Sequence, residues 1–167
     1  MLAAAASVGV LGVMAPAACA EDSVTTVTVI PALGESHFCK SVDMTALSGE
    51  YTLTKTVTPL PTGGYRVTGT ITVSTPIQLL GADGVTYVMS DQGRGSWFDL
   101  IATNGHPTGT FANSQRYEAP NRAGFDKGVL KTTTTLRADG SQTNSYGGNC
   151  GQEPTLNVTR LAKRIAR

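Results

Sequence analysis

The chain is poor in charge, in aromatic residues and in cysteine. Charged residues make up 15% of its 167 residues, and the formal net charge is +1. A balance this close to neutral argues against a protein that binds nucleic acid through bulk positive charge. The apolar fraction of 40% argues against a disordered chain. We therefore expect one modest globular domain, since this length is typical of one domain rather than two.

The chain also lacks uninterrupted stretches in which a long helix could form. It contains 19 glycines and 8 prolines, and threonine is frequent. Threonine favours strands, whereas glycine and proline interrupt helices. We predict an all-β domain over residues 21–159, folded as a single small antiparallel barrel or sandwich of about eight or nine short strands. Residues 160–167 hold four basic side chains and no acidic one, and we expect them to form a solvated basic tail.

The first twenty residues have the features of an export signal. They carry no charge, and an apolar run is followed by Pro16 and the triplet Ala18-Cys19-Ala20. Small residues two positions apart after such a run are typical of a signal-peptide cleavage site. We predict that residues 1–20 are removed after Ala20 and that the protein is secreted. In the alternative, Cys19 becomes an acylated first residue that anchors the protein at the cell surface.

Cysteine is scarce enough for its pairing to be predicted. Cleavage after Ala20 would remove Cys19 and leave only Cys39 and Cys150. Two cysteines in an exported domain most simply form one disulfide. Such a bond would tie the first third of the chain to its end.

A metal site is not expected. Four possible zinc ligands are present, but they lack the close Cys-x-x-Cys or His-x-x-x-His spacing that makes a zinc prediction specific. They are His37, Cys39, His106 and Cys150. Asp83 and Asp139 each precede a glycine, and we interpret them as turn residues rather than calcium ligands.

Alternation of side chains is clearest between residues 51 and 74. Residues 51–58 and 65–74 each alternate apolar side chains with threonines, and a segment rich in proline and glycine separates them. This pattern predicts a hairpin with one solvent-facing surface. Gly69, in the middle of the second strand, indicates a bulge or bend. Further strands are expected at residues 24–30, 77–80, 85–90, 97–103, 110–117, 129–136 and 155–160.

The most informative strand is expected at residues 96–101, where both faces are apolar except at Asp99. A strand that is apolar on both faces is usually central in its sheet. If the face of Asp99 lines an interior, the carboxylate needs a partner, because burying it unpaired costs several kcal/mol. Lys55 and Lys131 are candidates for that partner, since each interrupts a strand face.

A second interpretation places Phe98 and Leu100 in the core and leaves Trp97 and Asp99 half exposed. Trp97, the one tryptophan, and Asp99 could then form a binding site with Arg94, which lies between two glycines just before them. An aromatic ring supplies contact area for a ligand, and neighbouring charges fix its orientation. The alternative role of Trp97 is that of a core residue at one end of the fold.

The sequence favours a binding module over an enzyme. No nucleophile, base and orienting group occur in a known arrangement. We predict an exported, non-catalytic domain that binds a small molecule, an envelope polymer or a protein partner. The alternative is a secreted hydrolase that uses Asp99 or Glu118 with a histidine, either His37 or His106. We expect a monomer, with no cofactor and no nucleic-acid partner.

The general style of the sequence adds to the prediction of export. An apolar leader, threonine-rich strands and one late Cys150-Gly151 pair resemble the small secreted β proteins of high-GC Gram-positive bacteria. The resemblance implies a bacterial, secreted protein. It implies no particular activity.

Overall fold

The computed structural model describes residues 22–151 except 104–105 and 126, and within them the chain forms nine antiparallel strands in one sheet, with no helix. The strands are β1 (Val24–Pro31), β2 (Ser36–Cys39), β3 (Val42–Pro59), β4 (Tyr65–Gly81), β5 (Thr86–Asp91), β6 (Ser96–Ala102), β7 (Thr108–Glu118), β8 (Gly128–Leu136) and β9 (Gln142–Gly148). The prediction of an all-β, antiparallel fold is confirmed. In place of the two layers of a sandwich, all nine strands belong to one sheet. The segments 1–20, 155–160 and 160–167 of the sequence analysis lie outside the described residues.

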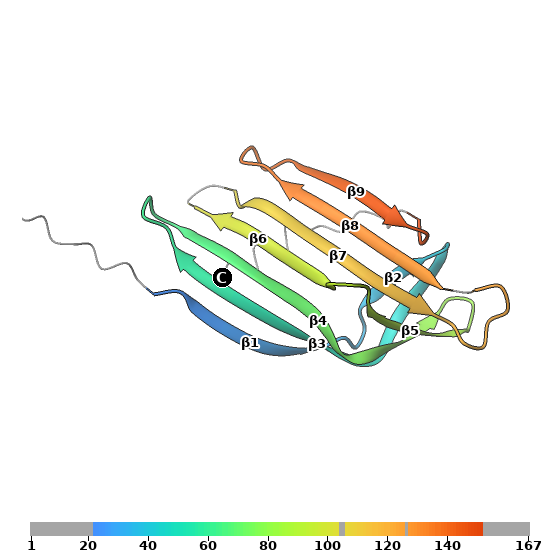
Figure 1. Ribbon diagram of the computed structural model, residues 1–167. Helices are drawn as coiled ribbons and strands as arrows, with labels where there is room; N and C mark the ends of the chain where they lie inside the picture. The colour runs from blue at the N-terminus through green and yellow to red at the C-terminus, as the bar shows by residue number, and fades with distance from the viewer. Residues whose placement is uncertain (1–21, 104–105, 126, 152–167) are drawn as a thin grey trace, which may run out of the picture.

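The sheet is a simple meander in which two of the strand positions are each divided between two consecutive strands. β1 and β2 both pair with β3, and β5 and β6 both lie between β4 and β7. β1 and β2 share one position in the order of strands across the sheet, and β5 and β6 share another. The chain therefore runs back and forth through seven positions, of which β8 and β9 are the last two. Figure 1 shows these strands side by side in one broad layer.

The hairpin turns form where positive φ angles are available. Gly84 and Gly140 adopt φ values of 76° and 81°. In each turn the preceding aspartate accepts a backbone hydrogen bond, from Val85 to Asp83 and from Ser141 to Asp139. These contacts match the interpretation of both aspartates as turn residues. The turn between β2 and β3 has no glycine, and Lys40 and Ser41 themselves adopt φ values of 50° and 64°.

One end of the sheet bends out of the layer, and we call it the curled end. It comprises β2, the first part of β3, the last part of β4, and β5 (Figure 1). The register between β3 and β4 shifts at three places between Ala46 and Tyr51. Bulges of this kind bend the strand that contains them and increase its twist. The bend carries β2 across to β8, on the far side of the sheet.

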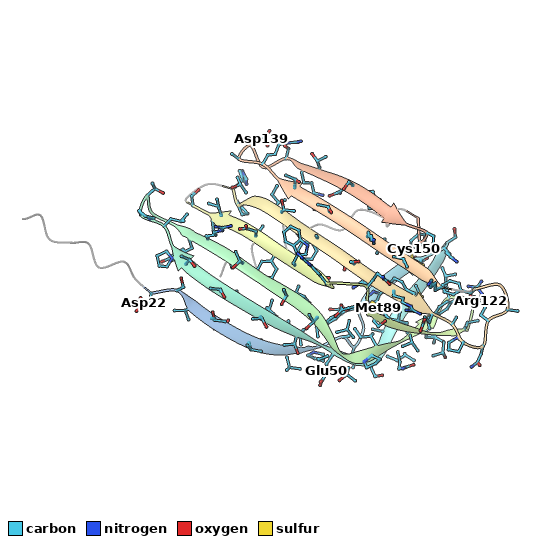
Figure 2. The ribbon with its side chains drawn as sticks, viewed as in Figure 1. Asp22, Glu50, Met89, Arg122, Asp139 and Cys150 are labelled. Carbon is cyan, nitrogen blue, oxygen red and sulfur yellow. A yellow bond between two sulfur atoms is a disulfide. The ribbon has the colours of Figure 1, made fainter. Side chains whose placement is uncertain are left out.

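A disulfide holds this bend closed. The sulfur atoms of Cys39, at the end of β2, and Cys150, just after β9, are 2.06 Å apart. The neighbouring Lys40 donates its backbone N–H to the carbonyl oxygen of Cys150 at 2.8 Å. In Figure 2, Cys150 lies at the same end of the molecule as Met89 and Arg122. The disulfide therefore joins the two outermost positions of the meander at the curled end.

The buried residues form two clusters on one face, which we call the inner face. The cluster of the curled end contains aromatic, aliphatic and sulfur side chains from six strands and the loops beside them: Ala32, Cys39, Val42, Met44, Ala46, Tyr51, Ile77, Leu79, Tyr87, Met89, Tyr117, Ala119, Phe125, Leu130 and Cys150. The smaller cluster of the flat half consists of Val67, Phe98, Leu100, Phe111 and Leu136. Phe98 and Leu100 are thus core residues.

Gly69 lies in regular pairing, so the expected bulge or bend is absent at this residue. It stands opposite Lys55 of β3 and Phe98 of β6, without a shift of register on either side. A Cβ atom at this position would lie 2.6 Å from Cζ of the Phe98 ring and 2.1 Å from the carbonyl oxygen of Thr54. The glycine is therefore explained by the close approach of its neighbours, which leave no room for a side chain.

Gly128, the first residue of β8, should be intolerant of any side chain. A Cβ atom there would lie 2.2 Å from Sγ of Cys39 and 2.9 Å from Sγ of Cys150. We expect Gly128→Ala to lower the free energy of unfolding by about 1 to 3 kcal/mol, the usual range for overpacking a core. Urea denaturation would measure this change.

The matched control for this prediction is Gly147→Ala in the neighbouring strand β9. Gly147 also has no positive φ, and the nearest atom to its added Cβ would be Cβ of Lys131 at 3.6 Å. That variant should be as stable as the wild type. Equal stability of the two variants would show that the disulfide does not lie against Gly128.

Candidate binding surface

The face opposite the core is a broad polar surface, which we call the outer face. Its residues are the alternate positions of β1, β3, β4, β6, β7, β8 and β9 that point away from the buried clusters. One row across it is set by direct cross-strand pairing and contains Val27, Thr54, Thr70, Trp97, Ala112, Thr133 and Ser145. A second row, one step along the strands, contains Thr25, Thr56, Thr68, Asp99, Thr110, Thr135 and Thr143.

These rows present hydroxyl groups at a regular spacing. Neighbouring strands are about 4.8 Å apart, and successive residues on one face are about 6.7 Å apart along a strand. Some of the hydroxyls at the β1 side pair with one another, as in the 2.8 Å hydrogen bond between Thr25 and Thr56. Hydroxyl groups therefore recur on this surface both along and across the strands.

Trp97 stands near the middle of the outer face. It occupies the fourth of the seven positions in its row, between Thr70 of β4 and Ala112 of β7. Its side chain is 39% exposed, whereas the adjacent Phe98 is 1% exposed on the inner face. A large aromatic ring is thus available to solvent in the centre of a flat, hydroxyl-rich surface.

Asp99, two residues along β6 from Trp97, forms an ion pair with Arg66. Nε and Nη2 of Arg66 donate to the two carboxylate oxygens at 2.9 and 2.6 Å. This bidentate contact holds the pKa of Asp99 below its usual value. The partner is therefore neither Lys55 nor Lys131, the two lysines considered from the sequence. Lys55 belongs to the inner face, as its pairing with Gly69 and Phe98 shows.

Arg94 does not belong to either of the strands that carry this ion pair. It is exposed in the loop that separates β5 from β6, where Gly93 and Gly95 have φ values of 65° and 67°. Between β4 and β7, this loop stands in place of a paired strand. The backbone N–H of Val73 in β4 therefore donates to the side chain of Asp91, at 2.8 Å, rather than to a neighbouring strand. Of the three residues proposed as a site, Trp97 and Asp99 share a strand face, and Arg94 belongs to the neighbouring loop.

Arg66 is the member of the site that the sequence analysis missed. The alternation of residues 65–74 already places it on the face of the threonines, opposite the apolar residues. Its partner Asp99 is 33 residues away in the chain. The pair forms because β4 and β6 are adjacent, and adjacency of strands is not contained in the alternation of either one.

The two carboxylates considered for a hydrolase are both engaged by arginines. Asp99 pairs with Arg66, and Glu118 pairs with Arg116. His106 is exposed in the connection between β6 and β7. Within the part of the chain that the structure describes, the histidine and carboxylate that approach within 4 Å are His37 and Glu35, at 3.9 Å.

His37 is buried in the curled end rather than placed in a catalytic arrangement. Its Nδ1 lies 3.4 Å from the hydroxyl of Tyr117, which itself donates to Gln115 at 2.8 Å. Burial lowers the pKa of His37 to about 4, and burial raises the pKa of Glu35. At neutral pH the imidazole is therefore uncharged, and its contact with Glu35 is not an ion pair.

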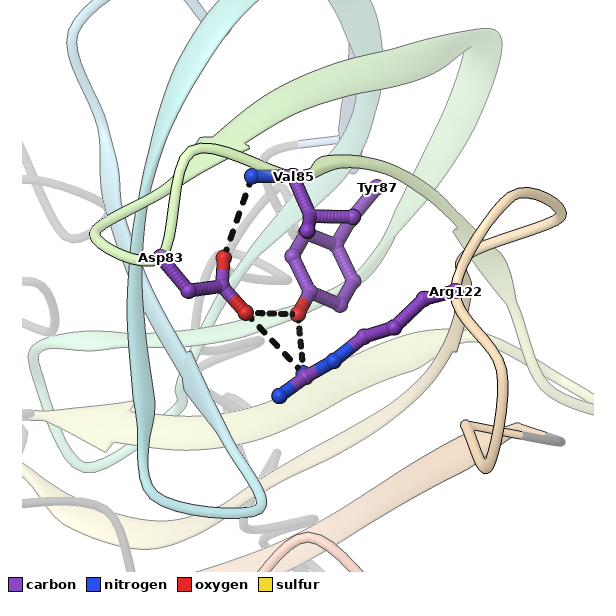
Figure 3. A network of polar contacts seen from close by, with 4 residues as sticks. All are labelled: Asp83, Val85, Tyr87 and Arg122. Carbon is purple, nitrogen blue, oxygen red and sulfur yellow. Dashed lines mark hydrogen bonds and ion pairs between the residues drawn. The ribbon is translucent and has the colours of Figure 1, made fainter.

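A second polar network closes the far side of the curled end (Figure 3). Arg122 contacts both the hydroxyl of Tyr87 and the carboxylate of Asp83, and the Tyr87 hydroxyl donates to Asp83 at 2.8 Å. The guanidinium group also lies 5.6 Å from the centre of the Phe125 ring. These contacts tie the turn after β4 to the loop after β7. A hollow of about 330 Å³ beside them is lined by Glu118, Ala119, Pro120, Arg122 and Phe125.

Two further observations concern metals and membranes. Among the described residues, no cluster of three or more histidine, cysteine, aspartate or glutamate side chains could hold a metal ion. Cys39 and Cys150, two members of the zinc set considered from the sequence, are bonded to each other. The part of the chain that the structure describes contains no apolar helix of the length needed to cross a bilayer.

The comparisons with known proteins supply no relative from which a role could be inferred. No family model, curated protein or solved structure matches the chain.

Proposed function

We propose that the protein is an exported, non-catalytic module whose outer face binds an extended, neutral polysaccharide such as a polymer of the cell envelope. The observation that carries the proposal is the exposed ring of Trp97, which lies among threonine hydroxyls and beside the Arg66–Asp99 pair. A sugar ring presents an apolar C–H face that packs on an indole and a rim of hydroxyls that need hydrogen-bond partners.

The charge of the surface favours a neutral ligand. Arg66 and Asp99 compensate each other, so the centre of the outer face offers donors and acceptors without net charge. The flat, open shape of the surface suits a long chain rather than a small molecule, since small ligands prefer concave sites. The disulfide supports export, because such bonds persist in oxidising compartments. With both candidate acids paired to arginines, the geometry favours binding over hydrolysis.

Sedimentation of the protein with insoluble glucan and chitin tests the proposal. We expect Trp97→Ala to weaken binding about tenfold, which corresponds to about 1.4 kcal/mol. Because the ring is part exposed, the same substitution should lower the free energy of unfolding by no more than about 1 kcal/mol, well under the cost of losing a core tryptophan. Binding that is unchanged in Trp97→Ala would refute the proposal.

Tyr65→Ala provides the matched control. Tyr65 is also an exposed aromatic residue of the flat half, at 47%, but it shares the face of Val67 rather than that of Trp97. Its substitution should leave polysaccharide binding unchanged. Release of reducing sugars from either polymer by the wild type would instead favour the hydrolase.

A further inference from the structure

The outer edge of β1 is an open strand edge. β1 pairs with β3 along its whole length, Val24–Pro31, and no described strand pairs with its other side. Seven of its eight residues are exposed. Such an edge presents backbone N–H and C=O groups that can pair with another strand.

The backbone groups that face outward can be identified from the register. Ala32 donates its N–H to the carbonyl oxygen of Gly49 at 3.0 Å, in direct continuation of the β1–β3 register. In an antiparallel pair, hydrogen-bonded and non-hydrogen-bonded residues alternate. The even-numbered residues of β1 therefore bond to β3, and Thr25, Val27 and Val29 direct their N–H and C=O groups outward. Pro31, which has no N–H, falls at an outward position.

Before its last residue, Pro31, β1 carries none of the features that usually protect an edge strand. Charged residues, prolines and bulges are the common ones. Residues 24–30 contain no charge and no proline, and their register with β3 has no shift. The opposite edge differs, because β9 ends in two glycines and Gly148 has a φ of 87°. Of the two edges, β1 is thus the one whose outward backbone groups are suited to pairing with another strand.

The sequence of β1 is complementary to itself in one antiparallel register. When Val27 is placed opposite Val27 of a second copy, Thr25 faces Val29 on the outer face. On the inner face, Thr26 then faces Thr28, and Val24 faces Ile30. Pairs of β-branched side chains stabilise antiparallel sheets, and no like charges meet. The outward N–H and C=O groups of residues 25, 27 and 29 coincide in this same register.

We propose that two copies of the chain associate through β1, antiparallel and centred on Val27, in place of the monomer expected from the sequence. A two-fold axis perpendicular to the sheet relates the copies, which is the common symmetry of homodimers. That axis keeps both outer faces on the same side. The result is one continuous sheet of twice nine strands, with both Trp97 side chains on one surface.

Sedimentation equilibrium over a concentration series tests the association. The protein used is the full-length chain with Cys19→Ser, so that Cys39 and Cys150 are its remaining cysteines. We expect the parent protein to form a dimer and Val27→Lys to sediment as a monomer, because the two lysines would meet at the axis. Thermal denaturation should show that Val27→Lys remains folded, since this exposed side chain and its outward N–H take no part in the core. A parent protein that stays monomeric at every concentration would overturn the proposal.

Cross-linking tests the register with a matched pair of cysteine variants. Directly opposite residues have Cα atoms about 5.5 Å apart, within disulfide range. Val27→Cys should therefore form a covalent dimer on oxidation. Val29 is exposed on the same face, but its two copies would be offset by four residues, about 13 Å along the strands. Val29→Cys should not cross-link, and equal cross-linking of the two variants would refute this register. Neither result depends on polysaccharide binding, so the dimer and the proposed function can fail separately.

Discussion

Loss of the Cys39–Cys150 disulfide should lower the free energy of unfolding by about 4 to 5 kcal/mol. The bond closes a loop with a sequence separation of 111 residues, and a cross-link of that length restricts the unfolded chain strongly. Domains of this size are stable by only about 5 to 15 kcal/mol. Cys150→Ser should therefore unfold at a much lower urea concentration than the wild type, and the wild type should shift in the same way on reduction.

The position of the bond makes the effect local as well as global. It joins the two outermost positions of the sheet at the curled end, where the backbone hydrogen bond from Lys40 to Cys150 is the neighbouring link. Hydrogen exchange in Cys150→Ser should increase first in β2 and at the start of β3, while β6 and β7 stay protected. Cys19→Ser serves as the control and should not change the denaturation curve. Equal stability with and without reductant would contradict the prediction.

The flat half of the sheet could be predicted well from alternation. The threonines of residues 51–58 and 65–74 share the outer face, and the structure pairs Thr54 with Thr70. The same period of two separates Trp97 from the buried Phe98. A strand's two faces follow from the extended backbone alone, so they can be read without knowledge of its neighbours.

Continuity through Pro76 could not be predicted in this way. Proline lacks an N–H and normally ends a central strand, so the sequence indicates separate strands at 65–74 and 77–80. In the structure β4 runs through Pro76 because neither neighbour pairs regularly there. On one side lies the irregular stretch of β3 near Glu50, and on the other the loop before β6. The tolerance for proline comes from these neighbours and not from the local sequence.

The curled end could not be predicted from the sequence for a related reason. β2 has only four residues, and its turn through Lys40 and Ser41 contains no glycine, proline, asparagine or aspartate. β9 is polar on both faces and carries no hydrophobic alternation. The predicted disulfide was the one sequence feature that connected these two segments. The bulges of β3 bend the sheet and so bring the two cysteines together. Neither the bulges nor the bend could be recognised from the sequence.

The second large effect concerns acid pH and His37. Its pKa is about 4 in the folded protein against 6.5 when exposed, because burial disfavours the charged imidazolium. Above pH 6.5 both the folded and the unfolded states hold a neutral ring, so this stability is fully present. As the pH falls from 6.5 towards 4, only the unfolded state gains the proton, and stability is lost. A shift of this size corresponds to about 3 kcal/mol in total.

The variant His37→Phe isolates this contribution, because it keeps a buried ring beside Tyr117 and removes the titration. The comparison is needed because burial raises the pKa values of Glu35 and Asp91, and these carboxyls shift stability in the opposite sense as they take up protons. The difference in unfolding free energy between wild type and variant should therefore change by about 3 kcal/mol between pH 7 and pH 4. His106→Phe, in an exposed loop, should follow the wild-type curve. An NMR titration that placed the pKa of His37 near 6.5 would show that the imidazole is reached by water, and the cluster around Tyr117 would then be open rather than sealed.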